Sequence, residues 1–277
     1  MKARPLDSRR ILVPESRELD LFARMLEEQG AVTLRCPMVA ILDVEDPEPV
    51  VVWLERLVAG GMDDLILLTG EGLRRLVAIA RSRSLDGPMI AALGRMRTIT
   101  RGPKPARALR EVGLVPSLPA LVPTSQGVVE ILAGEVLAGR RIGLQLYPGN
   151  LNPVLIDFLR TAGATPDPVL PYRYASAAAA SQVEAVIAEM AAGRIDAIAF
   201  TSSPQVGRLR DVARDSGKED ALRQGLAKTR IAAVGPVVAA AVEAIGGRIV
   251  AMPDSFHLKP LVAAISAAFA SERPASA

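Results

Sequence analysis

One pattern of segments occurs twice in this chain, and the repeat constrains the fold more than any other feature. RRILVPESRELDLFARMLEEQGA is followed much later by RRIGLQLYPGNLNPVLIDFLRTAGA, and two further pairs of segments match in the same order. The matched segments begin at Arg9 and Arg140, at Asp63 and Ile195, and at Thr98 and Arg230. All three pairs share an offset of roughly 131 to 133 residues, far beyond the period of stacking repeats, so the repeating unit is a domain.

Each half of the repeat is predicted to contain three units of strand, turn and helix. In the first unit, the apolar run 11–14 suits a buried strand, and the apolar residues of 19–29 recur at helical spacing until Gly30 ends the helix. In the second unit, LILLT leads directly into GEG and another helical pattern. Strands that alternate with helices in this way form a parallel sheet with helices on both faces, so we predict the α/β class.

Composition narrows the class of protein further. The chain has 277 residues and 50% of them are hydrophobic, which is enough for two domains with cores of their own. Aromatic residues make up only 3%, so the cores must be built from Ala, Val, Leu and Ile. The formal charge of +3 comes from scattered arginines rather than from a basic run. The sequence therefore gives little support for nucleic-acid binding and leaves anionic small molecules open.

Several kinds of site are not expected. The single cysteine, Cys36, excludes an internal disulfide bond, and the single histidine, His257, leaves no cluster with metal-ligand spacing, so we expect no metal. The charged amino-terminal segment is followed by only a short apolar stretch, without the hydrophobic region of a signal peptide. No apolar run reaches the roughly 18 residues of a membrane span. We therefore expect a cytoplasmic protein that does not bind membranes.

The turns after the predicted strands are the candidate ligand-binding residues. In doubly wound sheets, ligands bind beyond the carboxyl ends of the strands, where turns and helix amino termini present backbone N–H groups. Small and hydroxyl residues are frequent in these turns and suit the close approach of a carboxylate or phosphate. The candidates are Ser16, Arg17, Thr69, Gly70, Gly72, Arg95, Arg101, Gly102, Lys104, Ser125, Tyr147, Gly149, Asn150, Thr201, Ser202, Ser203, Gly235 and Val237.

Each candidate also has a purely structural explanation. The hydroxyl residues at 201–203 could serve only to cap the following helix. Arg95, Arg97 and Arg101 precede a Gly-Pro turn, and each alone could be an ordinary surface arginine. We nevertheless expect at least one of the three to meet a ligand carboxylate.

Six segments together resemble the uroporphyrinogen-III synthase family. They are PESRE at 14–18, LTGEGLRRL at 68–76, LQLYPGN at 144–150, PYRY at 171–174, FTSS at 200–203, and AVGPVVAAAVEAIGG at 233–247 with VAMP after it. No single segment is specific, but their order and spacing are, and the resemblance spans nearly the whole chain. The sequence is therefore identified as a member of this family by resemblance.

The resemblance implies an arrangement that the repeat alone does not. It implies two doubly wound, flavodoxin-like domains, with the second inserted into the first and a two-stranded extended linker between them. We place domain one at 1–37 plus 174–277 and domain two at 38–173. Prolines around Asp46 and Pro171 favour extended backbone in the two predicted linker segments.

The resemblance also implies a reaction. Family members cyclise hydroxymethylbilane, a linear tetrapyrrole with eight carboxylates, with loss of water and inversion of ring D through a spiro intermediate. They need no metal or organic cofactor, so we expect none here. Tyr172 matches the family's tyrosine that is the usual candidate for assisting departure of the hydroxyl, although it could also be a packed linker residue. We expect a monomer that makes transient contact with hydroxymethylbilane synthase.

One departure from the family keeps a second function open. Many members carry a threonine where this chain has Val238, two positions after Pro236 of the Gly-Pro turn. The substitution removes a hydroxyl from the expected site, which favours a non-catalytic tetrapyrrole-binding or regulatory protein. A third alternative is an unrelated two-domain receptor for small anions, which the lack of a signal peptide disfavours.

Overall fold

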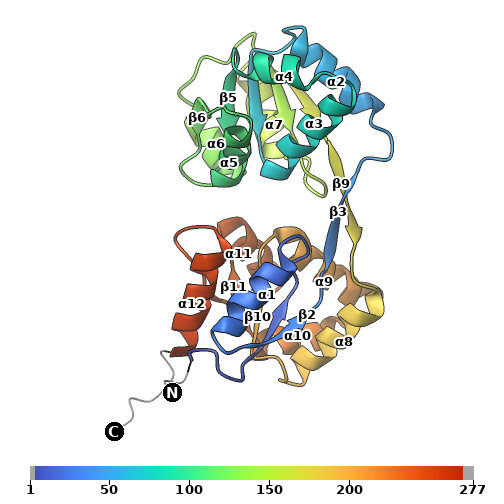
Figure 1. Cartoon of the computed structure of the whole chain (residues 1–277), viewed down its shortest axis with the longest axis vertical. Coiled ribbons are helices and arrows are strands. Elements are labelled where there is room, and N and C mark those ends of the chain that lie inside the picture. The colour runs from blue at the N-terminus through green and yellow to red at the C-terminus, as the bar shows by residue number, and fades with distance from the viewer. Residues whose placement is uncertain (1–3, 271–277) are drawn as a thin grey trace. The chain divides into compact units, whose positions relative to one another are not determined.

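A computed structural model describes residues 4–270 and divides the chain into two compact units. The first unit comprises the chain up to Ala40 and again from Ala175, and the second comprises Ile41–Tyr174. Each unit contains a five-stranded sheet, and the neighbouring strands within both sheets pair in parallel. The predicted α/β fold, with one doubly wound domain inserted into another, is confirmed (Figure 1).

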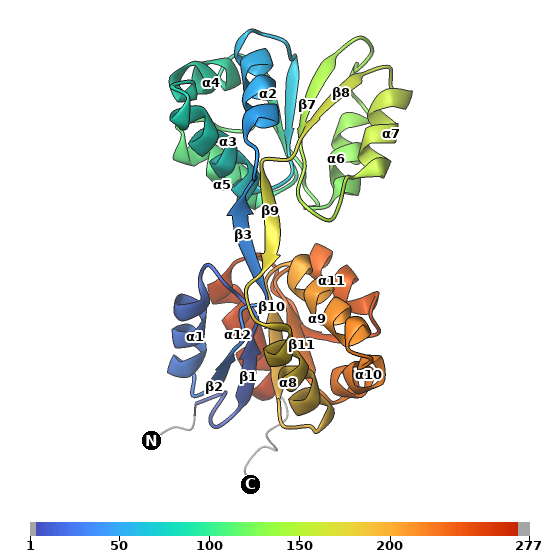
Figure 2. The same cartoon turned by 90° about the vertical axis from the view of Figure 1, so that its right-hand side faces the viewer.

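The sheet of the first unit has the strand order β12-β11-β10-β1-β2. Its strands are β1 (Arg10–Val13), β2 (Val32–Arg35), β10 (Ala197–Phe200), β11 (Arg230–Ala233) and β12 (Ile249–Ala251). One face is covered by α1 (Leu19–Glu28) and α12 (Leu258–Ala270) (Figure 2). The other face is covered by α8 (Ala180–Ala191), α9 (Ser203–Asp215), α10 (Glu219–Lys228) and α11 (Pro236–Glu243).

The sheet of the second unit has the strand order β6-β5-β4-β7-β8. Its strands are β4 (Asp64–Leu67), β5 (Arg97–Thr100), β6 (Leu118–Pro119), β7 (Arg141–Gln145) and β8 (Thr165–Val169). One face is covered by α2 (Glu48–Val58), α3 (Gly70–Ser82), α4 (Asp86–Leu93) and α5 (Pro103–Glu111), and the other by α6 (Ser125–Leu132) and α7 (Pro153–Thr161) (Figure 2).

The two sheets are circular permutations of one arrangement. The repeat equates β1 with β7, β4 with β10 and β5 with β11, and with these equivalences both sheets have the same strand order. Ile11 pairs with Ala197 in one sheet and Gly143 with Leu65 in the other, so the strand register equates Ile11 with Gly143, one residue beyond the match of Arg9 with Arg140. The two strands that open the first unit correspond to the two that close the second. A single offset therefore relates the halves even though one unit interrupts the other.

A separate two-stranded sheet lies where the chain passes between the units. It consists of β3 (Val39–Asp43) and β9 (Tyr172–Ser176), which confirms the predicted two-stranded linker. The prolines at 166, 168 and 171 precede or interrupt β8 and β9, whose backbone they hold extended. Among residues 4–270, no helix is both long enough and apolar enough to cross a membrane.

The cores are aliphatic, as the composition predicts. In the first unit, Phe22 and Phe200 lie fully buried among Ile, Leu, Val and Ala side chains on both faces of the sheet. In the second unit, Trp53 is buried under α2, and its indole N–H donates to the Asp167 carbonyl at 3.1 Å. The central strands of both sheets are buried, and they end in turns that contain polar residues.

Candidate functional site

The two sheets share one feature that positions a ligand site. In each sheet, the direction in which the chain winds reverses between two central strands, β1 and β10 in one unit and β4 and β7 in the other. Ligands of open α/β sheets bind at the carboxyl ends of the strands that flank such a switch point. The residues after these four strands are therefore the candidate site, and each unit is described in turn.

At the switch point of the second unit, Thr69 is held by Gln145. Thr69 follows β4 and caps α3, since its hydroxyl accepts the N–H of Gly72 at 3.0 Å. Its own N–H donates to Gln145 Oε1 at 3.0 Å, and its Oγ1 lies 3.3 Å from the same oxygen. Gln145 ends β7 and is fully buried. A Cβ on Gly72 would lie 2.0 Å from the Gln145 amide, so glycine is required there.

Tyr172 contacts the other side of the same threonine. Its hydroxyl lies 3.2 Å from Thr69 Oγ1, and the residue is only 1% exposed. Its ring meets that of Tyr174 edge to face, with centroids 5.7 Å apart. Burial raises the pKa of Tyr172 more than the Thr69 hydrogen bond lowers it, and burial likewise raises the pKa of Tyr174. Both phenols therefore stay protonated at neutral pH.

A cationic group lies at the same edge of this sheet. Arg101 follows β5, its Cζ lies 4.7 Å from the centroid of the Tyr147 ring, and its Nη1 donates to the Tyr147 hydroxyl at 3.1 Å. Asn150 Nδ2 donates to the same hydroxyl at 3.0 Å. Gly149, with φ of 80°, forms the turn between Tyr147 and Asn150. Three predicted site residues, Arg101, Tyr147 and Asn150, are thus in direct contact.

A further turn joins this group. Thr124 caps α6 by accepting the N–H of Gly127 at 2.9 Å, and the hydroxyl of Ser125 donates to Asn152 Oδ1. Asn152 is 3% exposed, adopts φ of 52°, and donates its N–H to Asn150 Oδ1 at 2.7 Å. The turns after β6 and β7 are therefore connected through Ser125 and Asn152.

The switch point of the first unit contains a carboxylate. Glu15 Oε2 accepts the hydroxyl of Thr201 and lies 3.4 Å from Gln205 Nε2, while Glu15 Oε1 accepts the N–H of Arg17 at 3.0 Å. Burial alone would raise the pKa of Glu15, but the hydrogen bonds from Thr201 and from the Ser16 and Arg17 N–H groups lower it below its usual value. Glu15 is therefore ionised at neutral pH.

The predicted hydroxyl turn of the first unit is organised by Gln205. Gln205 is 3% exposed, and its Oε1 accepts the N–H groups of Thr201 at 2.9 Å and of Ser202 at 3.2 Å. Ser203 begins α9 and is half-buried. Ser16, after β1, donates its hydroxyl to the Val39 carbonyl at 2.5 Å, whereas Arg17 is exposed.

The Gly-Pro turns lie at the same edges of their sheets. Gly102 has φ of 145°, and a Cβ there would lie 2.7 Å from Pro123. A Cβ on Gly235 would lie 3.0 Å from the Phe256 ring, so this turn is tightly packed as well. Val237 is half-buried and Val238 buried in the first turn of α11. Lys104 is exposed in α5, and its carbonyl would lie 2.6 Å from a Cβ on Gly70.

The structure separates one predicted residue from the rest. Arg95 precedes β5, whereas Arg101 follows it, so the strand places the two arginines at opposite edges of the sheet. A strand of four residues spans about 13 Å, which is too far for both to contact one carboxylate. Arg95 and Arg101 are close in the sequence but lie at opposite ends of β5. A substrate-binding role for Arg95 stays a prediction. Arg97, at the start of β5, pairs instead with Asp64 at 2.7 Å.

Two residues that organise the site were not singled out from the sequence. Gln205 is the third residue after Ser202, and this S-x-x-Q spacing is typical of a capping box, so a sequence signal was present. Asn152 precedes Pro153 at the start of α7, which is also a helix-start signal. Neither signal indicates that the side chain binds a neighbouring turn.

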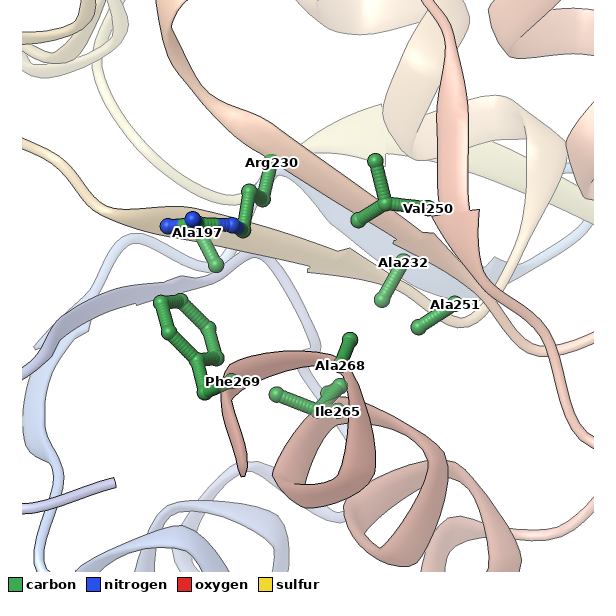
Figure 3. Close-up of a pocket in the computed structure, with 8 residues that line it drawn as sticks. All are labelled: Ala197, Arg230, Ala232, Val250, Ala251, Ile265, Ala268 and Phe269. Atoms are coloured by element: carbon green, nitrogen blue, oxygen red, sulfur yellow. The ribbon is translucent and has the colours of Figure 1, made fainter. Parts of the chain in front are cut away.

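A small pocket in the first unit lies away from these turns. It is lined mainly by apolar side chains, including Ala197, Ala232 and Ile265, with Arg230 stacked 4.5 Å from the Phe269 ring centroid (Figure 3). Ala197 and Arg230 begin their strands, so the pocket extends to the amino edge of the sheet. Within residues 4–270, no group of three or more His, Cys, Asp or Glu side chains is placed to bind a metal ion.

Fold and site together define a class. The chain is a two-unit α/β protein, with one unit inserted into the other and polar turns collected at the switch points of both sheets. A family model described as "Uroporphyrinogen-III synthase HemD" matches residues 20–263. The chain belongs to the uroporphyrinogen-III synthase family.

The chain is also similar to solved structures and to other proteins. A mutant uroporphyrinogen III synthase from Thermus thermophilus is 28% identical with a TM-score of 0.75, over 96% of this chain and 100% of that one. The wild-type Thermus protein is 27% identical with a TM-score of 0.60. The uncharacterized protein YjjA of Bacillus subtilis is 28% identical over 86% of this chain and 87% of its own length. A putative uroporphyrinogen-III synthase from Methanothermobacter thermautotrophicus is 29% identical, over 60% of this chain and 64% of its own.

Proposed function

We propose that this protein is a uroporphyrinogen-III synthase. It would cyclise hydroxymethylbilane with loss of water and inversion of ring D, in the biosynthesis of haem, sirohaem and cobalamin. The observation that most supports this activity is the group at the carboxyl edge of the second unit, where protonated hydroxyls of Thr69 and Tyr172 lie near the cationic Arg101. Such an edge suits a substrate that carries both a leaving hydroxyl and carboxylates.

Loss of the hydroxyl from a hydroxymethylpyrrole needs little acid catalysis. The C–O bond of the hydroxymethylpyrrole breaks with its electron pair on oxygen, which takes up a proton and leaves as water. The pyrrole nitrogen stabilises the cationic carbon, so an azafulvene forms readily. The substituted carbon of ring D must then attack to give the spiro intermediate, which reopens and closes with ring D inverted. Orientation of the chain of pyrroles is therefore the main contribution of the protein.

Tyr172 and Thr69 are the proposed hydrogen-bonding pair for the departing hydroxyl. The raised pKa of Tyr172 keeps its proton available as a donor, although it makes the phenol a weak acid. Tyr172 is buried and Thr69 is only half-buried. The Thr69 hydroxyl would therefore contact the leaving oxygen, turning its single proton away from Gln145 Oε1 toward that oxygen. Tyr172 would donate to Thr69 Oγ1 and so orient and polarise the hydroxyl.

Backbone N–H groups and hydroxyls of the remaining turns are proposed to bind substrate carboxylates. These turns begin helices, where the helix dipole favours negative charge. The residues proposed for this role are Ser16, Arg17, Gly70, Gly72, Gly102, Lys104, Ser125, Gly149, Thr201, Ser202, Ser203, Gly235 and Val237. The N–H groups of Gly72, Thr201 and Ser202 already have partners in their own turns, so these residues would line the site without donating those N–H groups. None of this binding requires a metal or an organic cofactor.

The isomers of the product test the proposal. The purified protein is incubated with hydroxymethylbilane that is generated enzymatically in the same vessel, and the oxidised uroporphyrins are resolved by chromatography. Uroporphyrin III in excess over the reaction without this protein supports a synthase. Accumulation of isomer I alone rules the activity out, because the unrearranged ring closure gives that isomer.

A non-catalytic tetrapyrrole-binding protein is the second candidate function. The observation that favours it is Val238, which is 5% exposed and offers no hydroxyl at the Gly-Pro turn of the first unit. Binding of uroporphyrin without formation of isomer III would support this candidate. We further propose a cytoplasmic monomer that receives its short-lived substrate through transient contact with hydroxymethylbilane synthase, since the azafulvene forms so easily in solution.

A further inference from the structure

Arg101 differs from three other half-buried arginines of the same unit. Arg75 pairs with Glu71 at 2.8 Å, and Arg97 and Arg140 both pair with Asp64. Arg101 forms no ion pair with any residue between 4 and 270, although stacking on the Tyr147 ring fixes its guanidinium. Among the residues that the structure describes, one acceptor binds its five N–H groups, the Tyr147 hydroxyl at 3.1 Å from Nη1. A fixed cation with several N–H donors left is thus present at the carboxyl edge of the sheet.

Tyr147 adds one more donor at this place. A phenol oxygen accepts two hydrogen bonds and donates one. The Tyr147 oxygen accepts from Arg101 Nη1 at 3.1 Å and from Asn150 Nδ2 at 3.0 Å, so both acceptor positions are filled. The remaining O–H must donate to something else. The Tyr147 O–H and the remaining N–H groups of Arg101 can donate to the same acceptor, and a negatively charged acceptor suits both.

The other unit contains a carboxylate at the equivalent position. Glu15 lies four residues after Ile11, and Tyr147 lies four residues after Gly143, the two residues that pair equivalently across the switch points. The carboxylate of Glu15 is bound by the Thr201 hydroxyl and by backbone N–H groups. One copy of the repeat thus supplies its own carboxylate, whereas the other has a neutral phenol with Arg101 beside it.

We propose that Arg101, Tyr147 and Asn150 form a binding site for one carboxylate side chain of the tetrapyrrole. Two guanidinium N–H groups of Arg101 and the O–H of Tyr147 donate to the carboxylate, and Asn150 holds the phenol in place. The inference rests on the proposed function for the identity of the ligand. The site itself requires only an acetate or propionate group on a larger molecule.

Porphyrin binding tests the site without requiring turnover. Uroporphyrin III, with eight carboxylates, is titrated into the wild-type protein and into Arg101→Met, Tyr147→Phe and Arg110→Met, with porphyrin fluorescence as the signal. Arg110 is an exposed arginine of the same unit, at the end of α5, and serves as the matched control. Circular dichroism and Tm establish that each variant is folded.

The expected pattern follows from the donors that each variant loses. Arg101→Met weakens binding about tenfold or more, since charge-assisted hydrogen bonds are lost. Tyr147→Phe weakens binding several-fold, and Arg110→Met binds as the wild type does. The decrease of affinity with added NaCl is shallower for Arg101→Met than for the wild type, because one ionic contact is absent. Coproporphyrin III, with four carboxylates, binds more weakly than uroporphyrin III. Its affinity decreases less on the Arg101→Met substitution.

Other outcomes separate this site from the proposed function. Equal affinities of the wild type and folded Arg101→Met overturn the site, even if isomer III is formed. Arg101-dependent binding without isomer III supports the site and rejects the synthase. No binding of either porphyrin to the wild-type protein overturns the site as well.

Discussion

The N–H of Thr69 donates to the side-chain oxygen of Gln145 at 3.0 Å, which ties the turn after β4 to the end of the neighbouring strand β7. The other unit holds the equivalent threonine differently, because the N–H of Thr201 donates at 2.9 Å to Gln205 of the helix that follows it. Both threonines thus present a fixed hydroxyl at a switch point. In each unit a glutamine side chain binds the threonine N–H, but Gln145 belongs to a strand and Gln205 to a helix.

Substitution Gly72→Ala is expected to destabilise the protein by about 1–3 kcal/mol. The added Cβ would lie 2.0 Å from the Gln145 amide, which is buried and cannot move without losing its bond to Thr69. Chemical denaturation measures the change in the free energy of unfolding. In a Gln145→Ala background the same substitution should cost much less, since the clash is gone.

Gly87→Ala is the matched control for this substitution. Gly87 also lies in the first turn of a helix of the second unit, but a Cβ there meets nothing within 4 Å. We expect a gain of about 0.5–1 kcal/mol from helix propensity alone. Similar effects of the two substitutions would contradict the close packing of Gln145 over the turn.

Asp64→Asn is expected to cost about 3 kcal/mol at neutral pH. Asp64 is 0% exposed and is bound by Arg97 and Arg140 at 2.7 and 2.6 Å. Burial would raise its pKa, but the hydrogen bonds from Arg140 and Arg97 outweigh this and lower it. The carboxylate therefore contributes stability above its unfolded-state pKa near ~3.9, and this is lost as the pH falls through the lower folded-state value.

Thermal unfolding between pH 7 and pH 2 measures how much Asp64 contributes to stability and whether that contribution falls or rises toward acid. The Tm difference between wild type and Asp64→Asn should be largest near neutrality and shrink below about pH 4. Asp157→Asn provides the comparison, because its ion pair with Arg160 spans 3.9 Å between exposed side chains and should contribute little. A difference that grows toward acid would refute the lowered pKa.

Tyr172→Phe is expected to reduce the rate of isomer III formation about tenfold while lowering stability by about 1 kcal/mol. The variant removes the phenol that lies 3.2 Å from the Thr69 hydroxyl and keeps the ring that fills the core. Tyr174→Phe is the comparison, since it removes a phenol that hydrogen-bonds Tyr172 rather than Thr69 and should lower the rate less. Full activity of the Tyr172 variant would leave the fold intact and remove this residue from the mechanism.

Much of the fold was predictable because the signals were local and repeated. Apolar runs such as 11–14 and 65–69 end in turns of Gly, Thr or Ser, and both proved to include the predicted central strands. The insertion of one domain was not encoded in any local pattern. The insertion was predicted only from the resemblance to the family. Two tandem domains and two circularly permuted, inserted domains give the same offset between repeated segments, so the repeat cannot distinguish them.

The sequence predicted which turns form the site, but not which side chains in those turns bind one another. The sequence placed Arg95 and Arg101 together, but a strand lies between them and sends them to opposite edges of the sheet. It also gave no reason for Gln145 to bind Thr69, since the contact joins residues 76 positions apart. Side-chain pairing across a sheet depends on strand order and register, and neither can be read from local composition.

Val238→Thr is expected to raise the rate of isomer III formation at a cost of about 1 kcal/mol in stability. The valine lies 5% exposed in the first turn of α11, so a hydroxyl there enters an apolar surrounding, and a bond to a carbonyl of the preceding turn would offset part of the cost. Val242→Thr, also buried in α11, should show the cost without the gain, because it lies a turn further from the carboxyl edge. If Val238→Thr loses stability and gains no activity, the missing hydroxyl is not what limits catalysis. If the wild type forms no isomer III and the variant does, the protein is a non-catalytic member of the family, and Val238 is the residue that prevents the reaction.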